Sequence, residues 1–350
     1  MDELKTFEDL KNHHKKVSRK SWLIILLTTV CLATTFFLAL FVGNYHLTIS
    51  EVLRAFVGDA NDNTNYALFE VRVPRLLCCI LIGAALSTSG LVMQSLFKNP
   101  MASPSVLGIS SGAAFGASLA ISFGVGGFLG KYAVPGMAFV FCFVTMIVVY
   151  FLARTKYGVA TTTLLLSGVA IGAFFNGLVS LLQYIVDKNV LSNIVYWTTG
   201  SLNNCGWNSF QLALIPIAIG IAIMVYYVKE LNLISAGEEQ AANMGVNVKR
   251  VRFTLIIATS LAVGGAVAIS GVIGFVGLIV PHIFRMIAGP NHRLLMPLCV
   301  VGGGTFMIIV DTIAKAGFST IILPVGILTS LLGAPFFIYI MKTRKREIWE

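Results

Sequence analysis

Charged side chains are scarce in this sequence. Asp, Glu, Lys and Arg make up only 11% of its 350 residues, whereas 57% are hydrophobic. Soluble globular chains carry about 25% charged residues, so this chain has too few to cover a surface in water. The shortage excludes an ordinary soluble domain, and the hydrophobic excess must be buried in some other medium.

Motifs for nucleotides, metals and catalysis are also missing. The nearest approach to a phosphate loop is the segment GVGGFLGKY at residues 124–132. A phosphate loop needs glycine and Ser or Thr where this segment has Val125 and Tyr132. The five histidines show no ligand spacing, and no cluster of His, Asp and Glu suggests an active site. The sequence therefore predicts a protein that is not an enzyme and that holds no metal or cofactor itself.

Cysteine is sparse and scattered. None of the six cysteines has metal-ligand spacing, and five of them fall within hydrophobic runs. A free thiol in such a run behaves as a small hydrophobic side chain. Cys205 lies outside the runs and has no evident partner. We expect the cysteines to be structural.

Hydrophobic residues fall in blocks of about 20, the length that a helix needs to cross ~30 Å of hydrocarbon. Trp22–Val42 is the clearest block and contains no charged residue. The pattern predicts an all-α polytopic membrane protein with about ten transmembrane helices. The predicted spans are residues 22–42, 74–97, 106–127, 133–153, 160–184, 208–228, 252–270, 272–288, 294–313 and 320–341.

The distribution of basic residues predicts the orientation. With the N-terminus in the cytoplasm, most of the 25 Lys and Arg residues fall in cytoplasmic segments, as the positive-inside rule requires. Both termini are then cytoplasmic, and the net charge of +10 does not indicate nucleic acid. We expect one transmembrane domain over 22–342, with cytoplasmic tails at 1–21 and 343–350. The outer basic residues would be Arg54, Arg72, Arg75, Lys131, Lys188 and Lys315.

The first 21 residues are too long and too mixed in charge for the start of a signal peptide, so we expect them to be retained.

Two predicted loops exceed simple connectors. The outer loop at 43–72 contains TISEVLRAF, whose cap and hydrophobic spacing predict a short amphipathic helix on the membrane surface. The cytoplasmic loop at 229–252 contains GEEQAANMG, residues 237–245. Its acidic start and its closing glycine predict a two-turn helix. A solvated connector is the alternative for this second loop.

The segment KNPMASPSVLG, residues 98–108, separates two hydrophobic runs. Its prolines prevent the helix from continuing, so the chain must turn there. Non-helical backbone at membrane depth is tolerated only where it lines water or is buried in protein. The segment therefore predicts a turn that lines water or is buried in protein, with a plain helix hairpin as the alternative.

Glycine recurs every four residues at Gly108, Gly112 and Gly116. One helix face then lacks side chains and can approach a neighbouring helix closely. Helix packing is the predicted role of these glycines, and direct contact with a substrate is the alternative.

Charge is almost absent from the predicted spans. Ion-coupled carriers usually bury acids or broken helices at mid-membrane, where the coupling ion binds. Asp187 and Asp311 would instead lie toward the outer ends of their spans. A transporter with neither an ATP site nor an ion site must receive its energy from a partner. The alternatives are a secondary carrier that acts alone and an integral membrane enzyme.

Six motifs, in order, resemble the FecCD-type permeases, the membrane subunits of ABC importers for iron–siderophores, haem and vitamin B12. The resemblance covers roughly residues 20–342. The motifs are VRVPRLL…IGAALSTSGLVMQSLFKNPMASPSVLGISSGAAFG (71–116), TTTLLLSGVAIG (161–172), YWTTGSL (196–202), GEEQAANMGVNV (237–248), GFVGLIVPHIFRMIAGPNHRLLMP (274–297) and LPVGILTSLLGAPFFIYIM (323–341).

The resemblance implies a ten-helix subunit with the type II ABC importer fold, in a bacterial cytoplasmic membrane. Its partners would be a second permease subunit, in a homodimer or a related pair, and two ATPase subunits that hold ATP and Mg. A substrate-binding protein would dock on the outer face. The resemblance does not choose among the iron–siderophore, haem and corrinoid cargoes.

The resemblance also implies roles for particular residues. The translocation gate would contain Asn99, Met101, Thr161 and Thr162. The segment that couples to the ATPase would include Gly237, Glu238, Glu239, Ala241, Met244 and Gly245. The residues that dock the binding protein would be Arg72, Arg75 and Lys315, and interfacial snorkelling is the alternative for the two arginines. The lysine keeps the charge of a basic docking residue but not the fork of arginine.

Overall fold

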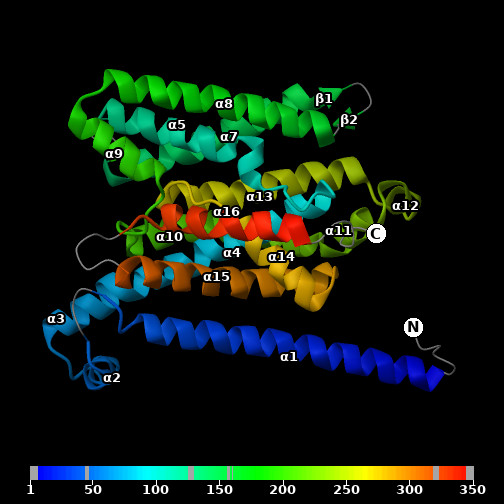
Figure 1. Cartoon of the computed structure of the whole chain (residues 1–350), viewed down its shortest axis with the longest axis horizontal. Coiled ribbons are helices and arrows are strands. Elements are labelled where there is room, and N and C mark those ends of the chain that lie inside the picture. The colour runs from blue at the N-terminus through cyan, green and yellow to red at the C-terminus, as the bar shows by residue number, and fades with distance from the viewer. Residues whose placement is uncertain are drawn as a thin grey trace.

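The computed structural model describes residues 7–43, 47–124, 130–155, 158–159, 161–317 and 323–343. Helices make up nearly all of this described chain, and the long ones run side by side along the longest axis of the molecule (Figure 1). The helices are α1 (Phe7–Ala39), α2 (Ile49–Val57), α3 (Asp62–Asn65), α4 (Val73–Leu96), α5 (Ile109–Ser122), α7 (Ala133–Ala153), α8 (Thr161–Ile185), α9 (Lys188–Thr198), α10 (Trp207–Tyr226), α11 (Val228–Ala236), α12 (Glu238–Asn243), α13 (Val248–Ser270), α14 (Val276–Ala288), α15 (His292–Ala316) and α16 (Val325–Thr343).

Shorter elements join some of these helices. The π-helical segment η1 (Tyr66–Arg72) leads into α4, and the 3-10 turns are η2 (Pro104–Leu107) and η3 (Gly130–Tyr132). Two short antiparallel strands, β1 (Arg154–Thr155) and β2 (Gly158–Val159), form a hairpin between α7 and α8. The prediction of a purely helical chain missed this hairpin, because two-residue strands leave no periodic pattern in a sequence.

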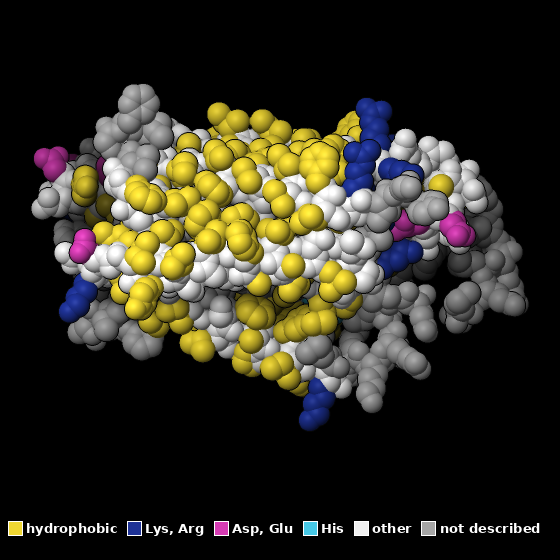
Figure 2. All heavy atoms as spheres, turned by 90° about the horizontal axis from the view of Figure 1, so that it is seen from above, with side chains coloured by type: hydrophobic (Ala, Val, Ile, Leu, Met, Phe, Trp, Pro, Cys, Tyr) yellow, Lys and Arg dark blue, Asp and Glu magenta, His cyan; other side chains and the backbone are white. Residues whose placement is uncertain are grey.

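Seven helical stretches of the described chain are long and hydrophobic enough to cross a membrane. Three shorter hydrophobic helices, at Ile109–Ser122, Val276–Ala288 and Val325–Tyr339, lie within the remaining predicted spans. Hydrophobic side chains cover the middle of the molecule, and charged side chains gather at its two ends (Figure 2). This banding is the surface that a multi-pass membrane protein presents to a bilayer.

The first helix differs from the prediction at its start. We expected a tail over residues 1–21 and a span from residue 22, but α1 already begins at Phe7 and continues unbroken to Ala39. The predicted tail is therefore helical from Phe7 onward. Sequence reasoning placed the boundary where hydrophobicity begins, and a helix does not need to end there.

Helix α4 forms the centre of the bundle. It packs against α15, α13, α14 and α10. Of the 18 most hydrophobic consecutive residues in Asp62–Leu96, the stretch that contains α4, 83% are buried. Helix α1 lies at the edge of the bundle against α15, and only 6% of its 18 most hydrophobic consecutive residues are buried. The exposed hydrophobic surface of α1 is suited to lipid.

Glycines let the central helices touch backbone to backbone. A Cβ atom on Gly90 would overlap the carbonyl oxygen of Gly277 in α14, and one on Gly83 would overlap that of Gly303 in α15. Without a hydrophobic driving force in lipid, such close van der Waals contact is a main source of helix association. These positions fix α14 and α15 on α4.

The glycines at 108, 112 and 116 also lie at helix contacts. A Cβ atom on Gly112 would overlap the hydroxyl of Thr145, and one on Gly116 would overlap the carbonyl oxygen of Met137, both in α7. Gly108 has a positive φ of 72° and faces the backbone of Gly168 in α8. This series therefore brings α5 against α7 and α8.

The bundle has two distinct ends. Helix α12 lies at one end, where α1 begins and α16 ends, and α2 and α3 lie at the opposite end (Figure 1). We call these the α12 end and the α2 end. The amphipathic helix predicted from TISEVLRAF is confirmed as α2, with a capping box between Thr48 and Glu51.

Candidate functional site

The proline-containing segment after α4 turns as predicted. Lys98 adopts a left-handed φ of 46° directly after the helix. The Met101 amide donates to Asn99 Oδ1 at 2.9 Å, and the Ala102 amide donates to the Asn99 carbonyl at 3.0 Å. Asn99 therefore organises the turn with its own side chain, in the manner of an Asx-turn. The side chain of Met101 is 47% exposed.

The second predicted gate segment begins α8. Thr162 lies in the first turn of this helix and is exposed, whereas the side chain of Thr161 lies outside the described part of the structure. Helix α8 contacts the turn η2, where the backbone of Leu107 approaches Gly168. The structure thus places the segment at 98–108 against α8 through Leu107 and Gly168. The gating roles of Asn99, Met101, Thr161 and Thr162 stay predictions.

The predicted two-turn helix at 237–245 is confirmed as α12. Gly237 separates it from α11, and Gly245 ends it with a positive φ of 86°. Ala241 is fully buried and anchors the helix, whereas Met244 is 69% exposed. Glu238 forms an ion pair with Arg252 at the start of α13. The result is a short, braced helix with an exposed tip, which is a suitable shape for contact with a partner.

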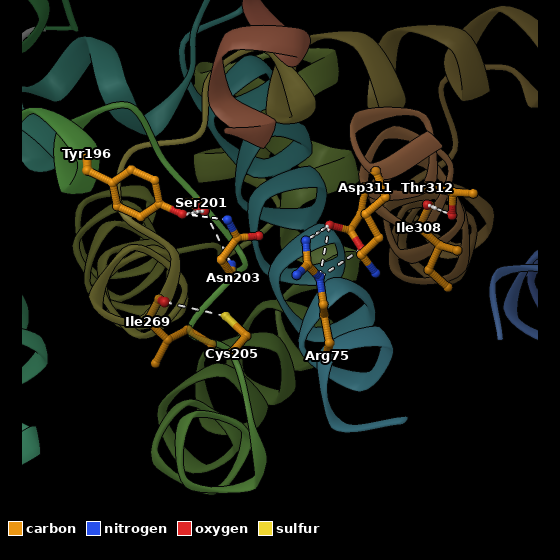
Figure 3. Close-up of polar contacts among 10 residues, drawn as sticks. Arg75, Tyr196, Ser201, Asn203, Cys205, Ile269, Ile308, Asp311 and Thr312 are labelled. Carbon is orange, nitrogen blue, oxygen red and sulfur yellow. Dashed lines mark hydrogen bonds and ion pairs between the residues drawn. The ribbon is translucent and has the colours of Figure 1, made fainter. Parts of the chain in front are cut away.

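The three predicted docking residues lie toward the α2 end. Arg72 is only 6% exposed, and its Nη1 donates to the carbonyl oxygen of Leu40. Arg75 Nη2 lies 2.7 Å from Asp311 Oδ1, and Arg75 Nε lies 3.1 Å from Asp311 Oδ2 (Figure 3). Lys315 Nζ lies 2.8 Å from Asp311 Oδ2. One buried carboxylate thus holds two cations.

This arrangement differs from what docking requires. A residue that pairs with a partner protein must present its charge at the surface. Arg75 and Lys315 instead form ion pairs with Asp311 inside the chain. Their docking role stays a prediction, and it would require the ion pairs to open. Sequence reasoning did not assign Asp311 a partner. Lys315 could have been proposed as its partner, because it follows Asp311 by four residues on a hydrophobic helix, where an isolated acid is costly.

A polar network at the α12 end was also missed. Ser95 Oγ lies 2.5 Å from His292 Nε2, and His292 Nδ1 lies 2.7 Å from Asn232 Oδ1. These three residues come from α4, α15 and α11, so the network joins three helices. No sequence spacing could reveal it, because its members are separated by 60 or more residues.

The banded surface and the glycine-packed core of long hydrophobic helices are those of a multi-pass membrane protein. The model of the FecCD transport family matches residues 31–343, which is most of the chain. The chain belongs to this family and is a permease of the ABC importer type.

Curated relatives that are named for different cargoes are similar to this chain in sequence. The cobalamin import system permease protein BtuC of Halobacterium salinarum is 39% identical over 278 residues, which cover 79% of this chain and 73% of that protein. The hemin transport system permease protein HmuU of Yersinia pestis is 38% identical over 293 residues, which cover 82% of this chain and 87% of that protein. The molybdate import system permease protein MolB of Haemophilus influenzae is 35% identical over 324 residues, covering 91% and 95%.

A solved structure shares the fold. It is an ABC transporter of the metal-chelate type in an inward-facing conformation, and it is 34% identical to this chain. The two agree with a TM-score of 0.83, and the match covers 92% of this chain and 99% of the other.

Proposed function

We propose that this chain forms the translocation path of an ATP-driven importer whose cargo is an iron–siderophore, haem or a corrinoid. The observation that carries the proposal is the family match over residues 31–343. Ten spans cross the bacterial cytoplasmic membrane in this proposal, and both termini lie in the cytoplasm. The seven long and three shorter hydrophobic helices of the described chain support that number.

Energy enters this importer through α12. Two ATPase subunits hold ATP and Mg beneath the permease and contact the exposed tip of α12 at Met244. The buried anchor at Ala241 and the ion pair between Glu238 and Arg252 brace the helix, so a force on the tip is passed to α11 and α13. A short rigid helix suits this role better than a flexible loop because it transmits displacement without folding first.

The other partners complete the path. A second copy of the chain forms the opposite wall, and a substrate-binding protein docks at the α2 end. The segment at 98–108 and the start of α8 close the path at the α12 end. Cargo choice belongs mainly to the binding protein, since relatives named for cobalamin, hemin and molybdate are all between 35% and 39% identical to this chain.

The test is reconstitution of the chain in liposomes with the ATPase and the binding protein encoded beside it. We expect uptake only when ATP, the ATPase and the loaded binding protein are all present. Replacing residues 237–245 by a flexible Gly-Ser linker should abolish uptake while the protein still inserts. Uptake by the chain alone, driven by an ion gradient, would instead establish a secondary carrier and overturn the proposal.

A further inference from the structure

A cleft of about 720 Å³ opens at the α12 end of the bundle. It lies between α11, the end of α14, the start of α15 and the last turn of α4. Its lining includes the polar and basic side chains of Ser95, Lys229, Asn232, Arg285, His292 and Arg293. The predicted gate, coupling and docking residues do not line it, and the polar network of Ser95, Asn232 and His292 does.

The charge of the cleft has one sign. Lys229, Arg285 and Arg293 contribute three positive charges, and none of the described residues that line the cleft is Asp or Glu. Glu230 follows Lys229 in the chain but does not line the cleft. Three cations around one concave volume raise the local concentration of anions. This is the electrostatic pattern of a site for an anion.

The floor of the cleft is built and fixed. Arg285 is only 7% exposed and His292 only 2%. Arg285 Nη2 donates to Ser95 Oγ at 3.5 Å, and Ser95 Oγ lies 2.5 Å from His292 Nε2. Asn232 Oδ1 accepts the backbone amide of His292 at 2.9 Å. The deep guanidinium of Arg285 therefore lies beside a hydrogen-bonded network that joins α4, α11 and α15, whereas Lys229 and Arg293 are exposed at the rim.

We propose that this cleft binds a phosphate group, either on the headgroup of an anionic phospholipid or as free phosphate. Guanidinium groups match phosphate oxygens in geometry and charge. Basic pockets between membrane helices on the cytoplasmic side are suited to anionic headgroups.

Occupation of the cleft would act on the neighbouring helix. The ligand would bridge Lys229 on α11 to Arg293 on α15, and α11 leads directly into α12. Bound phosphate would therefore hold the base of α12 against the bundle. The binding step itself does not depend on transport, so it can be measured on the isolated chain and can fail independently of the proposed function.

The test uses the purified full chain in neutral detergent. Dioleoylphosphatidylglycerol, inorganic phosphate and zwitterionic dioleoylphosphatidylcholine are each titrated, and the rise in Tm reports binding. Phosphatidylglycerol or phosphate should stabilise the wild type more than phosphatidylcholine does. A response to the lipid alone identifies a headgroup site, and a response to inorganic phosphate identifies a free-phosphate site. The proposal is wrong if neither anion stabilises the chain.

Two variants locate the binding. Arg293→Gln should weaken the affinity about fivefold, and the double variant with Lys229→Gln about 25-fold, from about 1 kcal/mol for each cation near a membrane surface. The matched control is Arg19→Gln with Lys20→Gln, two exposed cations on α1 outside the cleft. An equal loss in the control would show non-specific attraction and overturn the proposal. Cleft variants that bind both anions as tightly as the wild type but lose a partner ATPase would identify a protein contact and overturn the proposal as well.

Discussion

Arg75 and Asp311 join α4 to α15 through a single buried carboxylate, whose two oxygens lie 2.7 Å and 3.1 Å from the nearest guanidinium nitrogens. Lys315 adds a third contact to the same carboxylate at 2.8 Å. The cluster holds two cations and one anion, so removal of the anion leaves two like charges facing each other without compensation. The carboxylate is therefore the member on which the cluster depends.

The first prediction concerns this carboxylate. Asp311→Asn should destabilise the protein by about 3–5 kcal/mol, because breaking a buried pair leaves an uncompensated charge. Lys315→Met should cost clearly less, because Asp311 keeps its two contacts with Arg75. Unfolding of the purified chain in mixed detergent measures both. Equal losses for the two variants would contradict a cluster centred on Asp311.

The second prediction concerns the contact between α4 and α14. Gly90→Ala should destabilise the bundle by about 1–3 kcal/mol or more, because even a methyl group would overlap the Gly277 carbonyl and force the helices apart. Gly177→Ala in α8 is the matched control, because no atom lies within 4 Å of a Cβ placed there. Tm and monodispersity in detergent measure the effect. A neutral Gly90→Ala would show that the helices do not approach this closely.

Much of the fold could be predicted from the sequence because its signals are local. Hydrophobic blocks located the long hydrophobic helices, prolines located the turn after α4, and capping patterns located α2 and α12. Each of these signals lies within one continuous segment of about 20 residues or fewer. The continuation of α1 back to Phe7 was missed, since polar residues can remain helical beyond a hydrophobic block.

The sites were less predictable because their members are far apart in the sequence. Arg75 and Asp311 are 236 residues apart, and Ser95 and His292 are 197 apart. Only the packing of the helices brings such residues together. The sequence predicted that three basic residues lie toward one end of the bundle, but it could not show that Asp311 pairs with two of them inside it.

The third prediction concerns the pH dependence of α2. The amide and hydroxyl of Thr48 donate to the Glu51 carboxylate and hold the pKa of Glu51 below its ordinary value near 4.5. Because the pKa of Glu51 is lower in the folded chain than in the unfolded chain, the ionised carboxylate stabilises the helix at any pH above the unfolded-chain value. This contribution is lost as the pH falls through the folded-chain value. Hydrogen-exchange protection of residues 49–57 should therefore be constant from pH 7 to about 5 and fall below about pH 4.

The control for α2 is Glu51→Gln. Its protection should be lower than that of the wild type at neutral pH and should not change further in acid, because glutamine does not titrate. A wild-type helix whose protection is unchanged at about pH 3 would show that the capping box contributes nothing through its charge.

The fourth prediction rests on the proposed function and concerns the tip of α12. Met244 is 69% exposed, so Met244→Asp should leave Tm unchanged. A charge placed in a hydrophobic contact should nevertheless weaken association with the ATPase by about tenfold or more. Ala241→Asp differs because Ala241 is fully buried, and we expect it to unfold α12 and lower hydrogen-exchange protection there. Co-purification of the ATPase, measured beside Tm, separates the two effects. If Met244→Asp bound the ATPase as tightly as the wild type, the contact would have to lie elsewhere on the α12 end. The proposed coupling role of this helix would then be wrong.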